Sequence, residues 1–237
     1  MLSDNYVKHL NAIKKYNANG VLFEFGAGKS LLQNLFLSQH VLKQIVVDLN
    51  PMLDLTLVEE ARSLLANAIK LPSNKLISSR GDLIDYGIEY KAPFDACETG
   101  FPENSIDVCV STNTLEHIPQ EKLFEIFLEL NRTLKEPGIV SLIIDYSDHY
   151  SHTDSSIGPL NYLNYTESEW DKFNHQCHFQ NRLRHFDYLE ILQRSGFRIL
   201  EEDVTYANDP FIEPLKSRFA GSEQTWAATS GYILCGK

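Results

Sequence analysis

A short apolar strand that runs directly into a glycine turn constrains this chain more than any other feature. Residues 21–25 read Val-Leu-Phe-Glu-Phe, and Gly26-Ala27-Gly28 follows them. Glycine, which has no Cβ, lets the backbone turn sharply and approach a ligand closely. Asp48 closes the next apolar run, twenty residues after Gly28, where its carboxylate can reach ribose hydroxyls. The pattern predicts an α/β sheet that holds an adenosine-containing cofactor.

Three classes of cofactor use variants of this turn. A phosphate-binding loop needs a glycine five residues before the Gly28-Lys29 pair, where the sequence has Phe23. A nicotinamide or flavin fold needs a third glycine where Leu31 stands. S-adenosylmethionine (SAM) carries no phosphate, and its cationic end tolerates an acidic residue such as Glu24 before the glycines. The turn alone leaves SAM, a dinucleotide and a plain strand–helix turn without a ligand as open alternatives.

A second region, residues 95–119, separates these alternatives. It contains four motifs in order: Asp95-Ala96, Phe101-Pro102, Ser105-Ile106-Asp107 and Leu115-Glu116-His117-Ile118. Together they resemble the class I SAM-dependent methyltransferases, over roughly residues 20–145. Ser30 and Gly100 depart from the residues usual in that family.

The resemblance implies that the strand ends bind S-adenosyl-L-methionine. Its methionine part would contact the glycine turn, its ribose the acid after the second strand, and its adenine the residues that follow the second and third strands. The end of the fourth strand would lie under the transferable methyl group. The residues implied, in that order, are Glu24, Gly26, Ala27 and Gly28; Asp48; Leu49, Asp95 and Ala96; and Asn113.

Composition narrows the class of protein further. The 237 residues, 43% of them hydrophobic, suit one α/β domain, 1–237, with an insertion. No apolar run approaches the about 20 residues of a membrane span. The net charge of −11 argues against a nucleic-acid partner. The first residues lack a secretory signal, and Cys97, Cys109, Cys177 and Cys235 lack paired spacing, so we expect a cytoplasmic protein without disulfides.

Alternating strand and helix signals predict a Rossmann-like, doubly wound sheet with helices on both faces. Seven strands are expected, mainly parallel, and family analogy makes the last one antiparallel. The expected strands are 21–25, 44–48, 88–92, 106–111, 139–144, 197–203 and 230–235. The expected helices are 3–16 with Ser3 as N-cap, 29–39, 54–70, 120–135 with Pro137-Gly138 as its stop, and one from Asp187 to Ser195-Gly196.

Residues 145–185 interrupt this alternation. The segment is too long for a helix–strand connection, and its seven aromatic residues argue against disorder. Thr166 and Glu169 form a capping box that predicts a short helix. Because ligands of doubly wound sheets bind beyond the carboxyl ends of the strands, we expect a lid that forms the acceptor pocket and includes Tyr150. The same aromatics could instead serve a homodimer interface.

Candidates for the chemistry gather just past the fifth strand. Methylation of a hydroxyl requires alignment of donor and acceptor and removal of a proton. Within residues 145–154, we expect His149 to be the base, with Asp145 or Asp148 as its orienting partner. His152 is the second candidate and His117 the third.

Two further side-chain sets have competing interpretations. His149, His152, Asp154, His175 and His178 could converge on a divalent cation, but no spacing is diagnostic, so we predict no metal. Arg182 and Arg184 could bind a phosphate or carboxylate of the acceptor, or form local salt bridges.

The inserted segment also looks similar to methyltransferases associated with bacterial surface-polysaccharide synthesis. The similarity rests on Asp-His-Tyr-Ser-His, Tyr-Leu-Asn-Tyr and Asn-Arg-Leu-Arg-His. It implies a small-molecule or glycan acceptor, above all a sugar hydroxyl. Two alternatives stay open: an NAD-dependent oxidoreductase, which Glu24 and Leu31 disfavour, and a SAM-binding module without catalysis.

Overall fold

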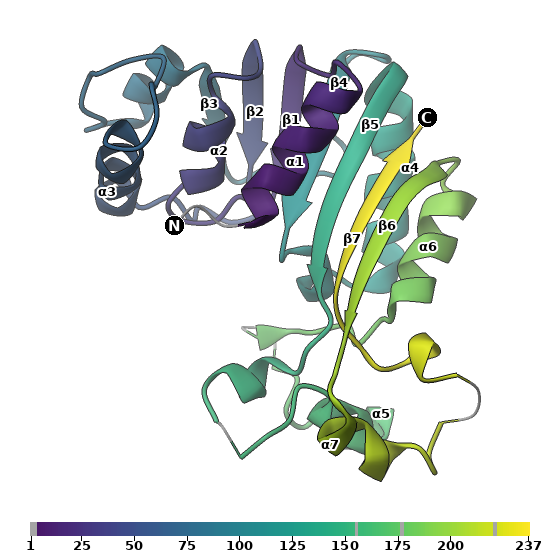
Figure 1. Ribbon diagram of the computed structural model, residues 1–237. Helices are drawn as coiled ribbons and strands as arrows, with labels where there is room; N and C mark the ends of the chain where they lie inside the picture. Colours follow the sequence, from purple (N-terminus) through teal and green to yellow (C-terminus); the bar gives the residue numbers. More distant parts are fainter. Residues whose placement is uncertain (1–3, 155, 176–177, 220–221) are drawn as a thin grey trace.

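A seven-stranded sheet forms the centre of the computed structural model, which describes residues 4–154, 156–175, 178–219 and 222–237 (Figure 1). The strand order is β3-β2-β1-β4-β5-β7-β6. The first five strands run parallel, and β7 pairs antiparallel with both β5 and β6. This confirms the predicted fold class. The strands are β1 (Val21–Phe25), β2 (Lys43–Val47), β3 (Ile88–Lys91), β4 (Ile106–Thr112), β5 (Leu134–Asp145), β6 (Arg198–Tyr206) and β7 (Ala228–Gly236).

Helices cover both faces of the sheet because successive strand residues point to opposite sides. Leu22 belongs to the core under α1 (Asp4–Lys15), α2 (Leu32–Leu37) and α3 (Leu55–Ala66). Phe23 belongs to the opposite core, under α4 (Gln120–Thr133) and α6 (His185–Arg194). Both faces are therefore closed, and the exposed carboxyl ends of the parallel strands are left for ligands.

Several predicted boundaries were wrong. Helix α2 begins three residues late because Leu31 adopts a left-handed backbone conformation, φ +49°, which ends the turn before the helix begins. Helix α6 begins at His185 because Asp187 is its third residue, whose carboxylate accepts from the Arg184 backbone N–H at 2.7 Å. Helix α3 is shorter than expected and is capped by Asp54. The expected N-cap Ser3 lies outside the described residues.

The predicted stop at Pro137-Gly138 does not separate α4 from β5. Strand β5 begins at Leu134, paired with Ile106, and the next pair is Val108 with Ile139. Residues 135–138 are therefore accommodated in a bulge between these two pairs. Proline is tolerated there because a bulge does not require its missing N–H.

A second layer lies beyond the carboxyl ends of the parallel strands and is built from two segments (Figure 1). The first is the insertion after β5, with 3-10 turns at His149–His152 and Asn161–Asn164 and helix α5 (Glu167–Trp170). Glu169 accepts from the Thr166 backbone N–H at 2.9 Å, which confirms the predicted capping box. The second is residues 207–227, between β6 and β7, for which the sequence predicted no element.

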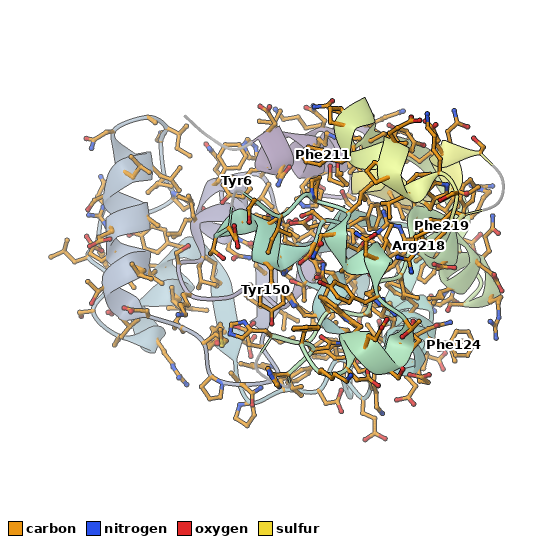
Figure 2. All side chains as sticks on the ribbon, turned by 90° about the horizontal axis from the view of Figure 1, so that it is seen from below. Tyr6, Phe124, Tyr150, Phe211, Arg218 and Phe219 are labelled. Carbon is orange, nitrogen blue, oxygen red and sulfur yellow. The ribbon has the colours of Figure 1, made fainter. Side chains whose placement is uncertain are left out.

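The two segments pack into one small core. Leu160 of the insertion joins Ile212, Leu215 and Trp226 of the second segment. Phe211 packs so closely over Gly158 that a Cβ there would lie 2.5 Å from its ring. The view from below labels Tyr150 of the insertion and Phe211 and Phe219 of the second segment (Figure 2). The described part of the insertion is thus packed against a second segment of the chain.

Hydrogen bonds tie the two ends of the insertion to each other. The Tyr146 hydroxyl lies 2.9 Å from His185 Nδ1, at the start of α6. Arg184 donates to the Tyr146 carbonyl at 3.1 Å, and the Tyr162 hydroxyl donates to the same carbonyl at 2.5 Å. The segment therefore leaves and re-enters the sheet layer at one place.

Two expectations from composition concern the whole chain. In the part that the structure describes, no helix is long and apolar enough to cross a membrane. Cys97, Cys109 and Cys235 are free thiols, and Cys177 lies outside the described residues.

Candidate active site

The two glycines of the turn after β1 have different reasons to be glycine. Both have positive φ, +75° at Gly26 and +72° at Gly28. A Cβ on Gly26 would lie 2.1 Å from the Thr114 side chain, so that position is fixed by packing. A Cβ on Gly28 would meet nothing within 4 Å. The backbone at Gly28 therefore borders open space, as a ligand cradle requires.

Asp48 is fixed beside this turn. It is 4% exposed, and its Oδ1 accepts from the Gly28 N–H at 3.2 Å. Its Oδ2 accepts from the Tyr90 hydroxyl at 2.8 Å, and Tyr90 in turn accepts from the Met52 N–H at 3.2 Å. Burial raises the pKa of Asp48, and these hydrogen bonds oppose the rise. Tyr90 was missed from sequence, although its register in β3, opposite Val46, places it next to the Asp48 strand.

A cavity of about 480 Å³ opens at the carboxyl ends of β1, β2 and β4. Its volume is in the range of small-molecule sites. Of the expected cofactor residues, five line it: Gly26, Asp48, Leu49, Asp95 and Ala96. Sequence reasoning missed most of its apolar wall, which includes Phe25, Val47, Met52, Phe94, Ile118 and Ile126.

The lining fits an adenosine without phosphates. Apolar walls suit an adenine ring, and the carboxylates of Asp48 and Asp95 suit ribose hydroxyls and an amino group. The same two acids disfavour a pyrophosphate. The pocket and the open space at Gly28 are therefore consistent with SAM.

The other four expected cofactor residues lie outside the lining of this cavity: Glu24, Ala27, Gly28 and Asn113. Glu24 is buried and accepts from Gln33 Nε2 at 2.9 Å and Asn34 Nδ2 at 2.5 Å. Burial raises the pKa of Glu24 to about 8. Asn113 is exposed at the end of β4, with φ +49° and its N–H on the Ile143 carbonyl at 2.9 Å. Their contacts with the methionine part of SAM stay predictions.

Residues 23–142 match a family model described as a methyltransferase domain. The chain belongs to this methyltransferase family. Its methyl donor is SAM. None of the curated proteins matches the sequence at a significant level.

Several solved structures have a similar fold. A protein from Bacillus halodurans C-125, named as a methyltransferase, is 13% identical, with 99% of each chain covered and a TM-score of 0.60. An S-adenosylmethionine-dependent methyltransferase from Mesorhizobium loti is 16% identical, with 97% and 96% covered and a TM-score of 0.56. The cyclase SpnF is 13% identical, with 97% and 80% covered and a TM-score of 0.56. At these identities the likeness shows a shared fold.

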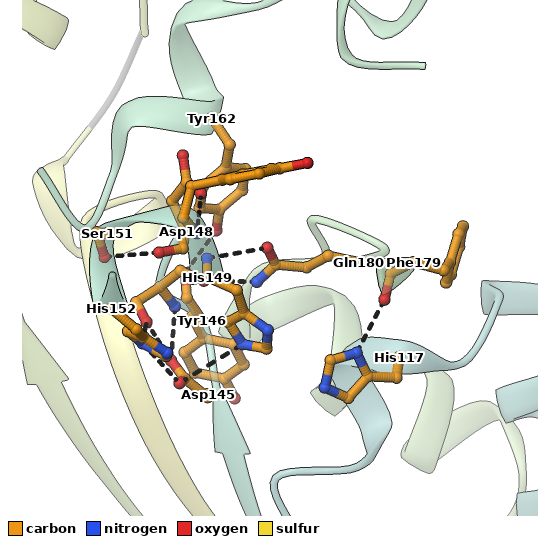
Figure 3. A network of polar contacts seen from close by, with 12 residues as sticks. His117, Asp145, Tyr146, Asp148, His149, Ser151, His152, Tyr162, Phe179 and Gln180 are labelled. Atoms are coloured by element: carbon orange, nitrogen blue, oxygen red, sulfur yellow. Dashed lines mark hydrogen bonds and ion pairs between the residues drawn. The ribbon is translucent and has the colours of Figure 1, made fainter. Parts of the chain in front are cut away.

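A histidine–carboxylate cluster lies at the end of β5 in this methyltransferase (Figure 3). Nε2 of His149 is 3.6 Å from Asp145 Oδ2, and Nε2 of His152 is 3.4 Å from it. The Ser147 hydroxyl lies 2.6 Å from Asp145 Oδ1 and 2.9 Å from His152 Nε2. Burial opposes ionisation of Asp145, but the nearby His149 imidazole and the hydrogen bonds from Ser147 outweigh it and lower the pKa of Asp145.

Asp148, the other expected partner of His149, has different contacts. Its carboxylate accepts from the Tyr150 backbone N–H at 2.9 Å and from Asn161 Nδ2 at 3.0 Å. It therefore caps the 3-10 turn, and the orienting carboxylate beside His149 is Asp145.

Residues 179–181, here called the strap, hold the two histidine-bearing turns together. The Phe179 carbonyl is 2.8 Å from His117 Nδ1. Gln180 donates to the Ser147 carbonyl at 2.5 Å and accepts from the His149 N–H at 3.4 Å. Asn181 donates to the carbonyls of Leu115 and Ile118, both at 2.8 Å.

His117 connects the histidine cluster to the methyl donor site. Its ring lines the 480 Å³ cavity, and its centroid is 4.9 Å from that of His149. No described residue of 145–185 lines this cavity itself. His117 therefore lies between the histidine–carboxylate cluster and the cavity.

The predicted acceptor residues lie elsewhere in the second layer. Arg182 donates to the carbonyls of Tyr162 and Tyr165 at 3.1 and 2.9 Å and pairs with Glu167. Arg182 and Arg184 line a separate cavity of about 260 Å³ with Leu163, Tyr165, Phe219 and Trp226. The Tyr150 hydroxyl donates to the Phe173 carbonyl at 2.8 Å. These contacts hold the insertion together, and an acceptor role for the three residues stays a prediction.

Proposed function

We propose that this SAM-dependent methyltransferase O-methylates a hydroxyl of a small-molecule or glycan acceptor, most specifically a sugar hydroxyl. The observation that carries the proposal is the cluster of Asp145, His149 and His152, placed next to His117 at the edge of the donor cavity. Imidazoles near a partly buried carboxylate are suited to remove a proton from an alcohol.

When bound, SAM supplies an electrophilic methyl group on a sulfonium. Asp48 would hold its ribose, Asp95 and Ala96 its adenine, and the turn from Glu24 to Gly28 with Asn113 its methionine part. These contacts would bring the methyl group and the acceptor oxygen into line, which itself supplies much of the rate. The new C–O bond forms as the C–S bond breaks.

The hydroxyl proton passes to the cluster. We assign His149 as first candidate for the acceptor of this proton, with Asp145 orienting it, His152 second and His117 third. His152 carries the more exposed ring, with 52% of its side chain accessible against 29% for His149. The ring of His149 lies beside those of His117 and His152, so the three imidazoles can accept the proton as one unit.

The second layer would act as the lid and acceptor pocket. Its exposed aromatic side chains, such as Tyr150 and Phe173, could stack on sugar rings, and Arg182 or Arg184 could bind a phosphate. An acceptor linked to a nucleotide or lipid, in cytoplasmic synthesis of a surface polysaccharide, fits these groups. The net charge of −11 disfavours nucleic acid as the substrate.

The test is transfer of a labelled methyl group from SAM to a panel of acceptors. The panel contains nucleotide sugars, lipid-linked glycan precursors, catechols and amines. Label in sugar hydroxyls is the expected result, and label confined to amines or catechols would overturn it. His149→Ala should keep SAM affinity and lose roughly 10²–10⁴-fold in turnover. The matched control is His40→Ala, a histidine after α2 that should leave turnover unchanged.

A further inference from the structure

Glu116 has a buried carboxylate without a hydrogen-bond partner. The residue is 2% exposed, and neither carboxylate oxygen forms a hydrogen bond with any described residue. Burial, with a smaller contribution from the nearby charge of Asp145, raises the pKa of Glu116 to about 8. Buried carboxylates are normally paired, because an unpaired one costs several kcal/mol.

The imidazoles of His117 and His149 adjoin this carboxylate, and their ring centroids are 4.9 Å apart. His117 Nδ1 must carry a hydrogen, because its partner, the Phe179 carbonyl, can only accept. In the neutral ring, Nε2 of His117 therefore holds a lone pair. Nε2 of His149 is buried and forms no hydrogen bond with a described residue, and the carboxylate oxygen Oδ2 of Asp145 lies 3.6 Å from it.

These three groups converge. One ligand atom each from Glu116, His117 and His149 lie within 4.8 Å of one another. Protonation of Glu116 would remove its charge but would leave an unpaired O–H in the same place. A cation would satisfy the carboxylate and both imidazoles at once.

We propose that Glu116, His117 and His149 bind a divalent first-row transition-metal ion. Two imidazoles and one carboxylate are ligands suited to Mn²⁺, Fe²⁺, Co²⁺ or Zn²⁺ and leave coordination positions open. Ligand atoms around such an ion lie roughly 3.0–3.4 Å apart for bonds of about 2.1 Å. Binding therefore draws the three side chains inward from their present separation.

Surrounding contacts match those of a metal site. The Phe179 carbonyl fixes the ring and tautomer of His117, as second partners of metal-bound histidines commonly do. The Gln180 side-chain oxygen accepts a hydrogen bond from the His149 backbone N–H at 3.4 Å. Asp145 lies 3.6 Å from His149 Nε2 and could complete the ligand set.

The catalytic use of the ion rests on the proposed function. An ion here would hold acceptor oxygens beside His117 and lower the pKa of a bound hydroxyl. His149 would then act as a ligand, and the proton would pass to His152 with Asp145. The predicted absence of a metal came from the sequence, in which Glu116 and His117 lie more than thirty positions from His149.

Binding is tested by titrating the chelator-treated protein with Co²⁺ and recording its d–d absorption. We expect one ion per chain, displaced by Zn²⁺. Glu116→Gln, His117→Ala and His149→Ala should each weaken binding by about 100-fold or more, since even second partners of ligands contribute about 10–100-fold. His40→Ala is the matched control and should bind as the wild type does. Unaltered Co²⁺ affinity in Glu116→Gln would overturn the proposal.

Folding is controlled by the same variant. Glu116→Gln replaces a buried unpaired carboxyl group by a neutral amide of the same shape, so its metal-free melting temperature should equal or exceed that of the wild type. Added metal should raise the melting temperature of the wild type and not that of Glu116→Gln. An equal rise in both would mean that the ion binds elsewhere.

The methyl-transfer assay separates this proposal from the proposed function. Metal binding without any sugar methylation would leave the ion in place and overturn the acceptor. Sugar methylation at full rate in chelator, without stoichiometric Co²⁺ binding, would leave the acceptor in place and overturn the ion.

Discussion

Gly28 offers the sharpest test of where SAM binds, because the chain contains matched controls. Gly28 and Gly100 have nearly the same backbone conformation, φ +72° and +66°, and a Cβ on either would meet nothing within 4 Å. Alanine at both positions should therefore cost the same, about 1–2 kcal/mol of stability, for a left-handed L-residue. Gly26→Ala should cost more, because its Cβ would also lie 2.1 Å from Thr114.

Binding should separate the two matched variants. The methyl group of Gly28→Ala would project into space next to Asp48, so SAM affinity should fall at least about tenfold, or 1.4 kcal/mol. Gly100→Ala should bind SAM like the wild type. Urea denaturation measures the stability cost, and titration calorimetry with SAM and NAD measures binding. Equal SAM affinity in the two variants, or NAD binding without SAM binding, would refute the reasoning.

Three further predictions concern single side chains. Asp48→Ala should weaken SAM binding by about 1–3 kcal/mol and Tyr90→Phe by about 1 kcal/mol, because ribose and Asp48 then lose hydrogen-bond partners; unchanged calorimetric affinity would place the ribose elsewhere. The pKa of Glu24, about 8 before binding, should fall beside the cationic end of SAM, so SAM binding should release a proton and tighten as pH rises toward 8. Calorimetry in buffers of different ionisation enthalpy measures the number of protons released, and Glu24→Gln should lose this proton release. Burial lowers the pKa of His9 from 6.5 to about 3, so the unfolded chain binds more protons between these values and stability is lost as pH falls below 6.5. The expected loss in the free energy of unfolding is about 2 kcal/mol at pH 5. Urea denaturation at pH 7 and pH 5 should show this loss in the wild type and not in His9→Asn, and an equal loss in the two proteins would contradict the prediction.

The half of the site that binds the cofactor could be predicted because its signals are local. A strand, a glycine turn and an acid at the next strand end follow one another in sequence, and parallel pairing brings them together. Local sequence signals gave a wrong boundary where packing against a neighbouring strand determines the backbone conformation. Pro137-Gly138 predicted a break between α4 and β5, but a bulge against β4 accommodates both residues.

Long-range packing set the rest of the site and could not be predicted. Glu116 is buried only because β5 and the strap, residues 179–181, close over its turn. Tyr90 reaches Asp48 through the register of β3 on β2. The segment between β6 and β7 packs against the insertion through contacts between residues some fifty positions apart. The local pattern of apolar residues in the sequence does not indicate such contacts.

The pinned ends of the insertion make it an exchangeable unit. Tyr146 and His185 are joined by a hydrogen bond, so β5 and α6 do not depend on the intervening chain to stay adjacent. Replacing about forty residues by about six would change the closure entropy by only about 2 kcal/mol. Replacement of this insertion could therefore change the acceptor specificity of a related enzyme while the site for the methyl donor stays the same. The strap marks the limit of such a graft, because it belongs by its contacts to the turn after β4.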